Sequence, residues 1–265
     1  MLDAFFIENY TFRPFTVEHF MVLASGTLFF LWVILYARKC SPQRQLFLGA
    51  LIGYAIITIY FFLFISLDAI RHGFEPKKHL PFHLCNVCGI SCWLVLHKRN
   101  YLAYEVLFFW ILSGTLAACL IPELKHSFPH YAFFAFWILH VGLVGSALYA
   151  TFVYGMRPRG KSLFTAFIAL NLYAVLVGLI NGLLHLMGYV HANYFYVCHK
   201  PDVPTPLDWF GKWPWYIFGG QILAAGIFIL IYLPFLISDR LQRRREQASD
   251  NRSEPADPTS GQPGP

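Results

Sequence analysis

The sequence predicts an all-α integral membrane protein, a transmembrane bundle of about seven spanning helices with its N-terminus outside the cytoplasm and its C-terminus inside. Hydrophobic residues make up 57% of the 265 positions and charged residues only 13%, whereas about a quarter of the residues are charged in a typical soluble domain. Apolar runs also recur along the chain, each near the length of about 20 residues that crosses a bilayer as a helix. Helices are expected because lipid offers no partner to free backbone groups, and no barrel-like alternation is present.

The seven predicted helices follow one another with short polar connections. We place them at residues 17–37, 46–67, 79–96, 102–121, 131–154, 163–190 and 215–237. Clusters of basic residues follow the first, third, fifth and seventh runs. The third run is short and polar at its start, and Pro214 precedes the last run, since proline suits the first turn of a helix.

The distribution of basic residues predicts the orientation of the bundle. Thirteen of the twenty Lys and Arg residues fall on the side that carries the C-terminal tail, and seven fall on the other side. Cytoplasmic loops carry the excess of Lys and Arg, so the C-terminus is placed in the cytoplasm and, with an odd number of helices, the N-terminus outside. The net charge of +6 therefore reflects topology, and nucleic acid is not an expected partner.

The chain divides into three regions by composition. Residues 1–16 form an outer N-terminal segment without the pattern of a removable signal peptide. Residues 17–238 form the transmembrane domain. Residues 239–265 form a tail that is first basic and then, from Gln247 onward, polar and rich in Pro, Ser and Gly, a composition typical of disorder. The basic run 240–245 anchors the orientation and could also contact anionic headgroups.

Polar residues within the apolar runs gather toward the outer half of the predicted bilayer. Placing imidazole or amide groups in hydrocarbon is costly, so such positions indicate function or specific pairing. His140 lies near mid-depth of the fifth helix. Two interpretations stay open for it: a functional role, or a hydrogen bond to a neighbouring helix. The remaining candidates near the outer surface are His83, Cys85, Glu123, His130, Asn181 and Asp208.

The string LPFHLCNVC at residues 80–88 supports three chemistries and a packing role. Cys85 can act as a nucleophile near a helix N-terminus, with His83 or His140 as the base. Cys85 and Cys88 have the spacing of a redox pair, and His83 with both cysteines could contribute to a metal site. Small soft residues that pack between helices are the alternative for Cys88 and Cys92. No motif in the chain implies a cofactor, and no Gly-rich phosphate loop is present.

Several ordered strings between residues 80 and 235 resemble the YwaF-like family of bacterial integral membrane proteins. They are LPFHLC (80–85), YEVLFFW (104–110), IPEL (121–124), FPHYAFFAFWILH (128–140), NLYAVLVGLIN (171–181) and PTPLDWFGKWPWY (204–216). The resemblance implies a multi-pass protein of a bacterial cytoplasmic membrane. That family is distantly similar to a eukaryotic multispanning phospholipid acyltransferase, with His83 and His140 at the shared histidine positions. This chain departs from the relative in having Phe82 where a cysteine precedes the first histidine, and Cys85 stands two residues after it.

The sequence thus predicts a lipid-modifying enzyme that carries out acyl transfer or hydrolysis, with its site in the outer half of the bilayer. His83 and His140 are expected to handle protons, and Cys85 is the candidate nucleophile. The residues expected to bind or orient substrate are Glu123, His130, Asn181 and Asp208. Membrane lipids are the expected partners. A small-solute transporter or binding protein and a non-catalytic membrane scaffold are the alternative functions.

Overall fold

The computed structural model describes residues 3–6 and 11–253, and within them it contains helices and no strand. The α-helices are α1 (Val17–Ala37), α2 (Pro42–Ile59), α3 (Leu67–His72), α4 (Pro76–His79), α5 (Leu84–Leu96), α6 (Tyr101–Trp110), α7 (Leu116–Leu120), α8 (Tyr131–Phe152), α9 (Gly160–Leu186) and α10 (Trp215–Ser253). Two π-helical segments, η2 (Tyr60–Ser66) and η3 (Ile111–Thr115), join α2 to α3 and α6 to α7. Three 3-10 turns complete the chain: η1 (Asp3–Phe6), η4 (Tyr194–Tyr196) and η5 (Pro206–Phe210).

Six continuous helical stretches are long and apolar enough to span a membrane, which confirms the predicted fold class. They are α1, the combined stretch Pro42–His72, the combined stretch Tyr101–Leu120, α8, α9 and Trp215–Gln247. The last of them belongs to α10, which continues as a helix to Ser253, past the point where the sequence predicted disorder. The rest of the predicted disordered tail, residues 254–265, lies outside the described residues.

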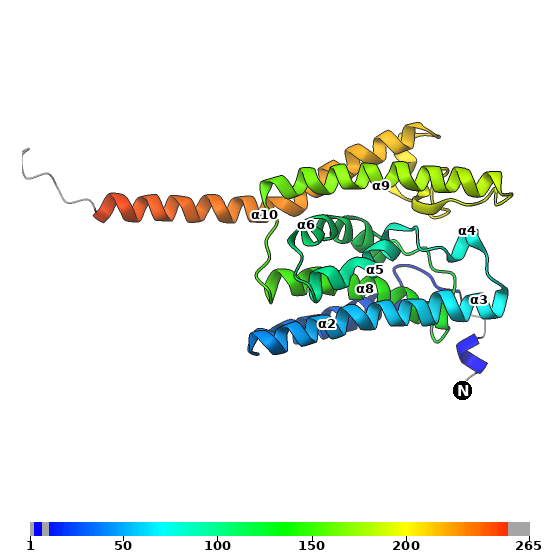
Figure 1. The fold of residues 1–265 in the computed structure, drawn as a ribbon, viewed down its shortest axis with the longest axis horizontal. Helices are drawn as coiled ribbons and strands as arrows, with labels where there is room; N and C mark the ends of the chain where they lie inside the picture. The colour runs from blue at the N-terminus through cyan, green and yellow to red at the C-terminus, as the bar shows by residue number, and fades with distance from the viewer. Residues whose placement is uncertain (1–2, 7–10, 254–265) are drawn as a thin grey trace, which may run out of the picture.

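The predicted third spanning helix is the exception, because its helix is only 13 residues long. At 1.5 Å per residue α5 is about 20 Å long, shorter than the hydrocarbon core of about 30 Å. His79, the first residue of the predicted run, is the last residue of α4, and residues 80–83 form a bent, non-helical connection to α5. Figure 1 shows α5 inside the bundle between α2, α6 and α8.

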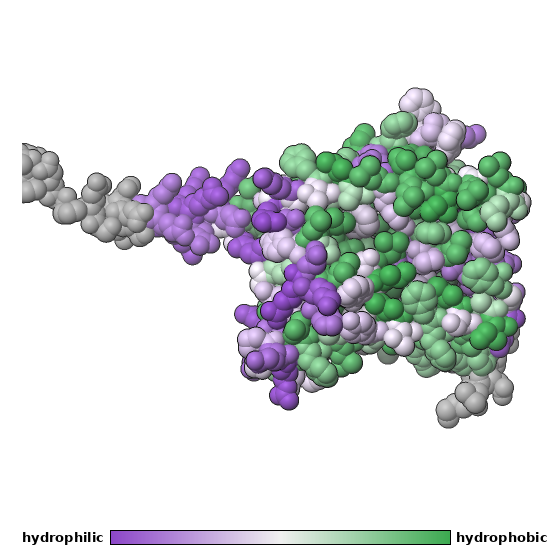
Figure 2. All heavy atoms as spheres, in the orientation of Figure 1, coloured by the Kyte–Doolittle hydropathy of each residue, from purple (hydrophilic) through white to green (hydrophobic). Residues whose placement is uncertain are grey.

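The two ends of the bundle differ in their connections. We call the end that holds α4 and the connections 73–83, 121–130 and 187–214 the N-side, and the opposite end, from which α10 projects, the C-side (Figure 1). η1 lies at the N-side, where Phe6 contacts Tyr131 and Arg71. Hydrophilic residues gather most densely at the C-side (Figure 2), the side that carries the larger share of Lys and Arg.

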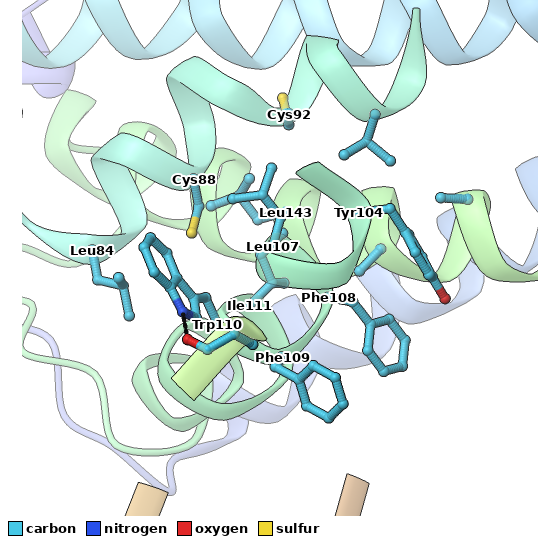
Figure 3. Packing of buried hydrophobic residues seen from close by; sticks show 14 of the residues in the cluster. Leu84, Cys88, Cys92, Tyr104, Leu107, Phe108, Phe109, Trp110, Ile111 and Leu143 are labelled. Carbon is cyan, nitrogen blue, oxygen red and sulfur yellow. Dashed lines mark hydrogen bonds between the residues drawn. The ribbon is translucent and has the colours of Figure 1, made fainter. Parts of the chain in front are cut away.

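The centre of the bundle is an apolar core arranged around α5. Figure 3 shows the Cys88 sulfur pointing toward side chains of α6 and Leu143 of α8, whereas the Cys92 sulfur points the other way, toward α2, where it lies 3.8 Å from the Gly53 carbonyl oxygen. The indole of Trp110 donates a hydrogen bond to the Ala166 carbonyl at 3.1 Å, which ties α6 to α9. Cys88 and Cys92 are buried in this core as free thiols, as their packing interpretation predicted.

Glycines allow neighbouring helices to approach closely. A Cβ atom added to Gly145 of α8 would lie 2.2 Å from the Phe30 ring of α1, and one added to Gly49 of α2 would lie 2.0 Å from the Tyr154 hydroxyl. Small residues at such contacts are a common basis of helix association in membranes, because close backbone approach maximises van der Waals packing. These contacts fix α1 and α2 against α8.

One buried carboxylate joins helices at the C-side. Glu105 of α6 accepts hydrogen bonds from Arg159 Nη2 at 2.7 Å and from the Ser162 hydroxyl at 2.7 Å. Glu105 is buried, whereas the Arg159 side chain is largely exposed. The pair therefore lies at the boundary of the bundle and anchors the start of α9 to α6.

Candidate functional site

The first turn of α5 begins within the bundle, next to the predicted site residues. Leu80 has φ −72° and ψ 141°, as expected for a residue before proline, since the Pro81 ring disfavours the helical region for the preceding residue. The chain stays non-helical to His83, which is the N-cap residue of α5. The backbone carbonyl of His83 accepts the amides of Asn86 and Val87, but its side chain makes no capping bond.

The imidazole of His83 is surrounded by aromatic side chains and by a second imidazole. Its ring centroid lies 5.1 Å from that of Tyr194 and 5.4 Å from that of Tyr196. It also interacts electrostatically with His140 of α8. The two histidines are more than fifty residues apart in the sequence, and the fold places them within electrostatic range of each other.

His140 is held in one tautomer by its own helix. Its Nδ1 lies 2.7 Å from the Phe136 carbonyl oxygen, and because a carbonyl only accepts, Nδ1 carries the proton and donates. The ring stacks on Phe136 with centroids 4.0 Å apart. In the neutral ring Nε2 then holds the lone pair, and no described residue donates a hydrogen bond to it. His140 therefore presents a basic nitrogen inside the membrane domain.

The thiol of Cys85 lies where several helices meet. Thr115 Oγ1, at the end of η3, donates a hydrogen bond to Cys85 Sγ at 3.6 Å. The thiol also interacts electrostatically with Tyr60 of η2, Tyr173 of α9 and Tyr196 of η4. Since Tyr196 contacts the His83 ring as well, Cys85 and His83 have this tyrosine as a shared neighbour.

Both π-helical segments contribute to this neighbourhood. Tyr60 is the first residue of η2, and Thr115 is the last residue of η3. A π-helical turn inserts an extra residue into a helix and re-aims the side chains that follow, and such turns occur often at functional sites. Thr115 bonds Cys85 Sγ and Tyr60 interacts with it electrostatically, so both π-helical segments place a side chain near the candidate nucleophile.

The connection between α9 and α10 closes the N-side of the site. Asn181 is fully buried and bonds both backbone groups of Tyr194, donating to its carbonyl at 3.0 Å and accepting from its amide at 3.0 Å. The Tyr194 hydroxyl donates to the Pro76 carbonyl and accepts from the Leu80 amide. Asn181 thus positions the loop that covers His83, which gives it a structural role beside the site.

Tyr196 connects this loop to Glu123. Phe195 and Tyr196 have φ values of 59° and 54°, in the left-handed region that non-glycine residues seldom adopt. Such strained residues cluster at functional sites. The Tyr196 hydroxyl donates to the Glu123 carboxylate. Burial raises the pKa of the Tyr196 phenol, and the nearby carboxylate raises it further, so the phenol stays protonated.

Residues 14–232 match the TMEM164 family. The chain belongs to the TMEM164 family. No curated protein and no solved structure matches the chain. The match covers the whole membrane domain up to α10 and agrees with the multi-pass architecture. It supports the coarser part of the sequence resemblance, a multispanning membrane family, whereas the narrower resemblance to bacterial YwaF-like proteins stays a prediction.

Two predicted site residues of this TMEM164-family chain have their described contacts elsewhere. His130 caps α8, accepting from the Ala132 amide at 3.1 Å, and stacks on His126. Asp208 accepts from the Thr205 amide and pairs with Lys200 at 2.6 Å, and the Lys200 hydrogen bond lowers the pKa of the Asp208 carboxyl. These contacts give both residues local structural roles at the N-side surface.

The sequence analysis did not identify Tyr60, Thr115 or Tyr196 as site residues. Tyr60 and Thr115 lie within apolar runs, and their approach to Cys85 depends on π-helical turns that hydropathy does not reveal. Phenolic groups in an aromatic-rich membrane protein also resemble ordinary packing residues. The strain at Tyr196 is a property of the loop conformation, which the sequence does not reveal.

A second omission is a buried carboxylate at the N-side, Asp68 of α3. It accepts hydrogen bonds from Lys78 at 2.5 Å, from His79 Nε2 at 2.7 Å and from the Tyr131 hydroxyl at 2.5 Å, and it lies 3.2 Å from His72 Nδ1. We call Asp68, Lys78, His79 and Tyr131 the Asp68 cluster. It joins α3, α4 and α8, and α4 leads directly into the stretch that ends at His83.

The cysteine and histidine side chains form no metal-binding group in the described chain. Across residues 3–6 and 11–253, no three His, Cys, Asp or Glu side chains lie together in a way that could hold a metal ion. All six cysteines are free thiols.

Proposed function

We propose that this protein is a membrane-embedded acyltransferase or lipid hydrolase that forms a thioester on Cys85. The observation that carries the proposal is a thiol in the first turn of a helix, bonded by Thr115, in a membrane domain where His140 presents an unbonded Nε2 and interacts electrostatically with His83. A helix N-terminus favours a thiolate through the helix dipole. Lipids are the molecules with reactive esters that reach such a position.

The first half-reaction transfers an acyl chain to the protein. An imidazole, His83 or His140, takes the proton from Cys85 Sγ, and the thiolate attacks the carbonyl carbon of a lipid ester. A C–S bond forms, the ester C–O bond breaks, and the imidazolium returns the proton to the leaving alkoxide. The products are a thioester on Cys85 and a lysolipid or other alcohol.

The second half-reaction returns the thiol. The hydroxyl of an acceptor lipid, or water, loses its proton to the imidazole and attacks the thioester carbonyl. The C–S bond breaks and Cys85 Sγ regains a proton. Transfer and hydrolysis therefore share the same residues and differ in whether a lipid hydroxyl or water reaches the acyl group.

The positioning groups follow from the contacts around the site. Thr115 orients the Cys85 thiol, and Phe136 fixes the tautomer of His140. Tyr196, protonated and bonded to Glu123, contacts the His83 ring and interacts electrostatically with Cys85. Glu123 acts through Tyr196 rather than on substrate directly. With the C-side in the cytoplasm, as the basic residues predict, the site lies in the outer half of the bilayer of a bacterial cytoplasmic membrane.

The test uses the full-length protein in proteoliposomes with a phospholipid that carries an alkyne-tagged acyl chain. Mass spectrometry should locate the tag on Cys85, and neutral hydroxylamine should remove it, as expected of a thioester. Cys85→Ala should abolish labelling, and His140→Gln should reduce it by about 10² to 10⁴-fold, the usual contribution of a general base.

Cys40→Ser is the matched control, because Cys40 is a half-exposed thiol at the C-side that bonds only the Tyr36 carbonyl among the described residues. It should label like the wild type. Absence of any acyl adduct on folded wild-type protein, across diacyl and ether phospholipids, would refute the proposed function.

A further inference from the structure

The hydroxyl of Tyr60 stands out among the buried phenols of the molecule. Tyr60 is 4% exposed, and its hydroxyl oxygen has no hydrogen-bond partner within the described chain. Other buried tyrosines are satisfied: Tyr104 donates to the Met156 carbonyl and Tyr149 to the Gln45 carbonyl. Because an unpaired buried hydroxyl costs free energy, phenylalanine would pack in this position at lower cost.

Tyr60 lies next to the first turn of α5. It interacts electrostatically with both Cys85 and Tyr194, and its ring stacks on Phe64 with centroids 5.5 Å apart. Tyr60 is the first residue of the π-helical segment η2, so the change from α-helical to π-helical geometry occurs at this residue. The hydroxyl therefore lies in the same neighbourhood as the candidate nucleophile.

The backbone of α5 supplies further donors at this place. The amides of Asn86 and Val87 donate to the His83 carbonyl at 3.0 and 3.2 Å, but within the described residues the amides of Leu84 and Cys85 have no carbonyl partner. The first amides of a helix lack intrahelical acceptors and carry the positive end of its dipole. Unpaired donors from a helix start and from a phenol thus lie near one thiol.

We infer that the Tyr60 hydroxyl and the first amides of α5 form a binding site for the carbonyl oxygen of an acyl ester. This inference rests on the proposed function and assigns Tyr60 as a catalytic residue. When the Cys85 thiolate attacks the ester carbon, negative charge develops on the carbonyl oxygen, and preorganised donors stabilise that charge. Tyr60 keeps its proton throughout and donates a hydrogen bond only. The hydroxyl is unpaired in the free protein because its acceptor arrives with the substrate.

The experiment compares two reactions of Cys85 in Tyr60→Phe protein in proteoliposomes. Acylation by the alkyne-tagged phospholipid passes through an oxyanion and should slow by about 10² to 10³-fold, the usual effect of losing one such donor. Alkylation of Cys85 by iodoacetamide forms no oxyanion at a carbonyl under attack and should keep its rate. Tyr54→Phe is the matched control, because Tyr54 lies on α2 near the C-side, where its hydroxyl bonds His97; it should leave both rates unchanged.

Each outcome decides a separate claim. Equal acylation rates in wild-type and Tyr60→Phe protein would overturn the role of Tyr60 and leave the proposed function intact. Parallel slowing of acylation and alkylation would show an effect on the thiol itself and would also overturn it. No acylation of the wild type would overturn both proposals.

If Tyr60→Phe protein does not accumulate, the wild-type thioester decides. Its isotope-labelled carbonyl stretch should lie at lower frequency in the folded protein than after denaturation, because a hydrogen-bonded carbonyl vibrates more slowly. Equal frequencies would refute the site.

Discussion

The Asp68 cluster gives a prediction whose magnitude can be worked out from its contacts. Asp68→Asn keeps the shape of the side chain but replaces one acceptor oxygen with an NH2 group, which only donates. In the native protein the two carboxylate oxygens face Lys78 and His79 on one side and Tyr131 on the other. In either amide orientation, one of these sides meets a donor instead of an acceptor.

The cost depends on which donors are buried. The His79 side chain is 1% exposed, whereas that of Lys78 is 46% exposed and can be hydrated again. A buried donor left without its acceptor costs about 1–3 kcal/mol, and loss of an exposed ion pair adds about 0–1 kcal/mol. In the other tautomer His79 Nδ1 would donate to the Glu75 carbonyl at 3.2 Å, but the Glu75 amide, which now donates to Nδ1 at 2.8 Å, would lose its acceptor. We therefore expect Asp68→Asn to lower the free energy of unfolding by about 1–4 kcal/mol.

The assay is equilibrium unfolding in mixed micelles, monitored by tryptophan fluorescence. Lys78→Ala serves as the matched comparison, because it removes only the exposed partner and should cost about 0–1 kcal/mol. Limited proteolysis should also cut the connection around Gly73 faster in Asp68→Asn protein, since α4 loses its attachment to α3. The reasoning is wrong if Asp68→Asn and Lys78→Ala have the same stability, or if Asp68→Asn matches the wild type within about 0.5 kcal/mol.

Three further predictions test the packing, the loop and the orientation. Gly145→Ala should destabilise the protein by about 1–3 kcal/mol, because the added methyl group overlaps a phenyl ring of α1. Gly178→Ala is its control in the same unfolding assay: the Cβ position there is open space, so this change should be neutral or stabilising. Asn181→Ala should cost about 2–4 kcal/mol through two lost buried hydrogen bonds and should accelerate hydrogen exchange across residues 189–200; unchanged exchange would show that the loop is held by other contacts. In intact cells a membrane-impermeant maleimide should label Cys198, in the N-side loop, and spare Cys40 at the C-side; the reverse pattern would invert the predicted topology.

The fold class could be predicted because hydrophobic length is a direct consequence of bilayer thickness. The boundaries of α1 and α8 agree with the predicted runs to within two residues. The start of α5 could not be placed in the same way, because residues 79–83 contain two histidines beside Leu80, Pro81 and Phe82, and hydropathy does not fix where such a mixed stretch becomes helical. Pro81 gave the local signal: the residue before it is extended, so the helix begins three residues later, at Leu84.

The candidate site was predicted in part. The choice of His83, Cys85, His140 and Asn181 as candidates came from the cost of polar groups in hydrocarbon. The same argument does not separate them from His130 and Asp208, whose described contacts are with nearby backbone and, for Asp208, with Lys200. Asp68 went unnoticed because it follows a long apolar run, and its partners on α4 and α8 are distant in sequence.

A polar residue in this membrane domain is not by itself a sign of a functional site. A packing residue differs from a candidate site residue in having all of its hydrogen-bonding groups paired. His19 accepts from the Phe15 amide and donates to the Cys119 carbonyl, so both ring nitrogens are used. Such a residue has a complete structural explanation. The Tyr60 hydroxyl and His140 Nε2 have no partner among the described residues. Tyr60 interacts electrostatically with Cys85, and His140 with His83. Unpaired polar groups are costly within a membrane, so a cluster of them is expected where a ligand supplies the missing hydrogen-bond partners.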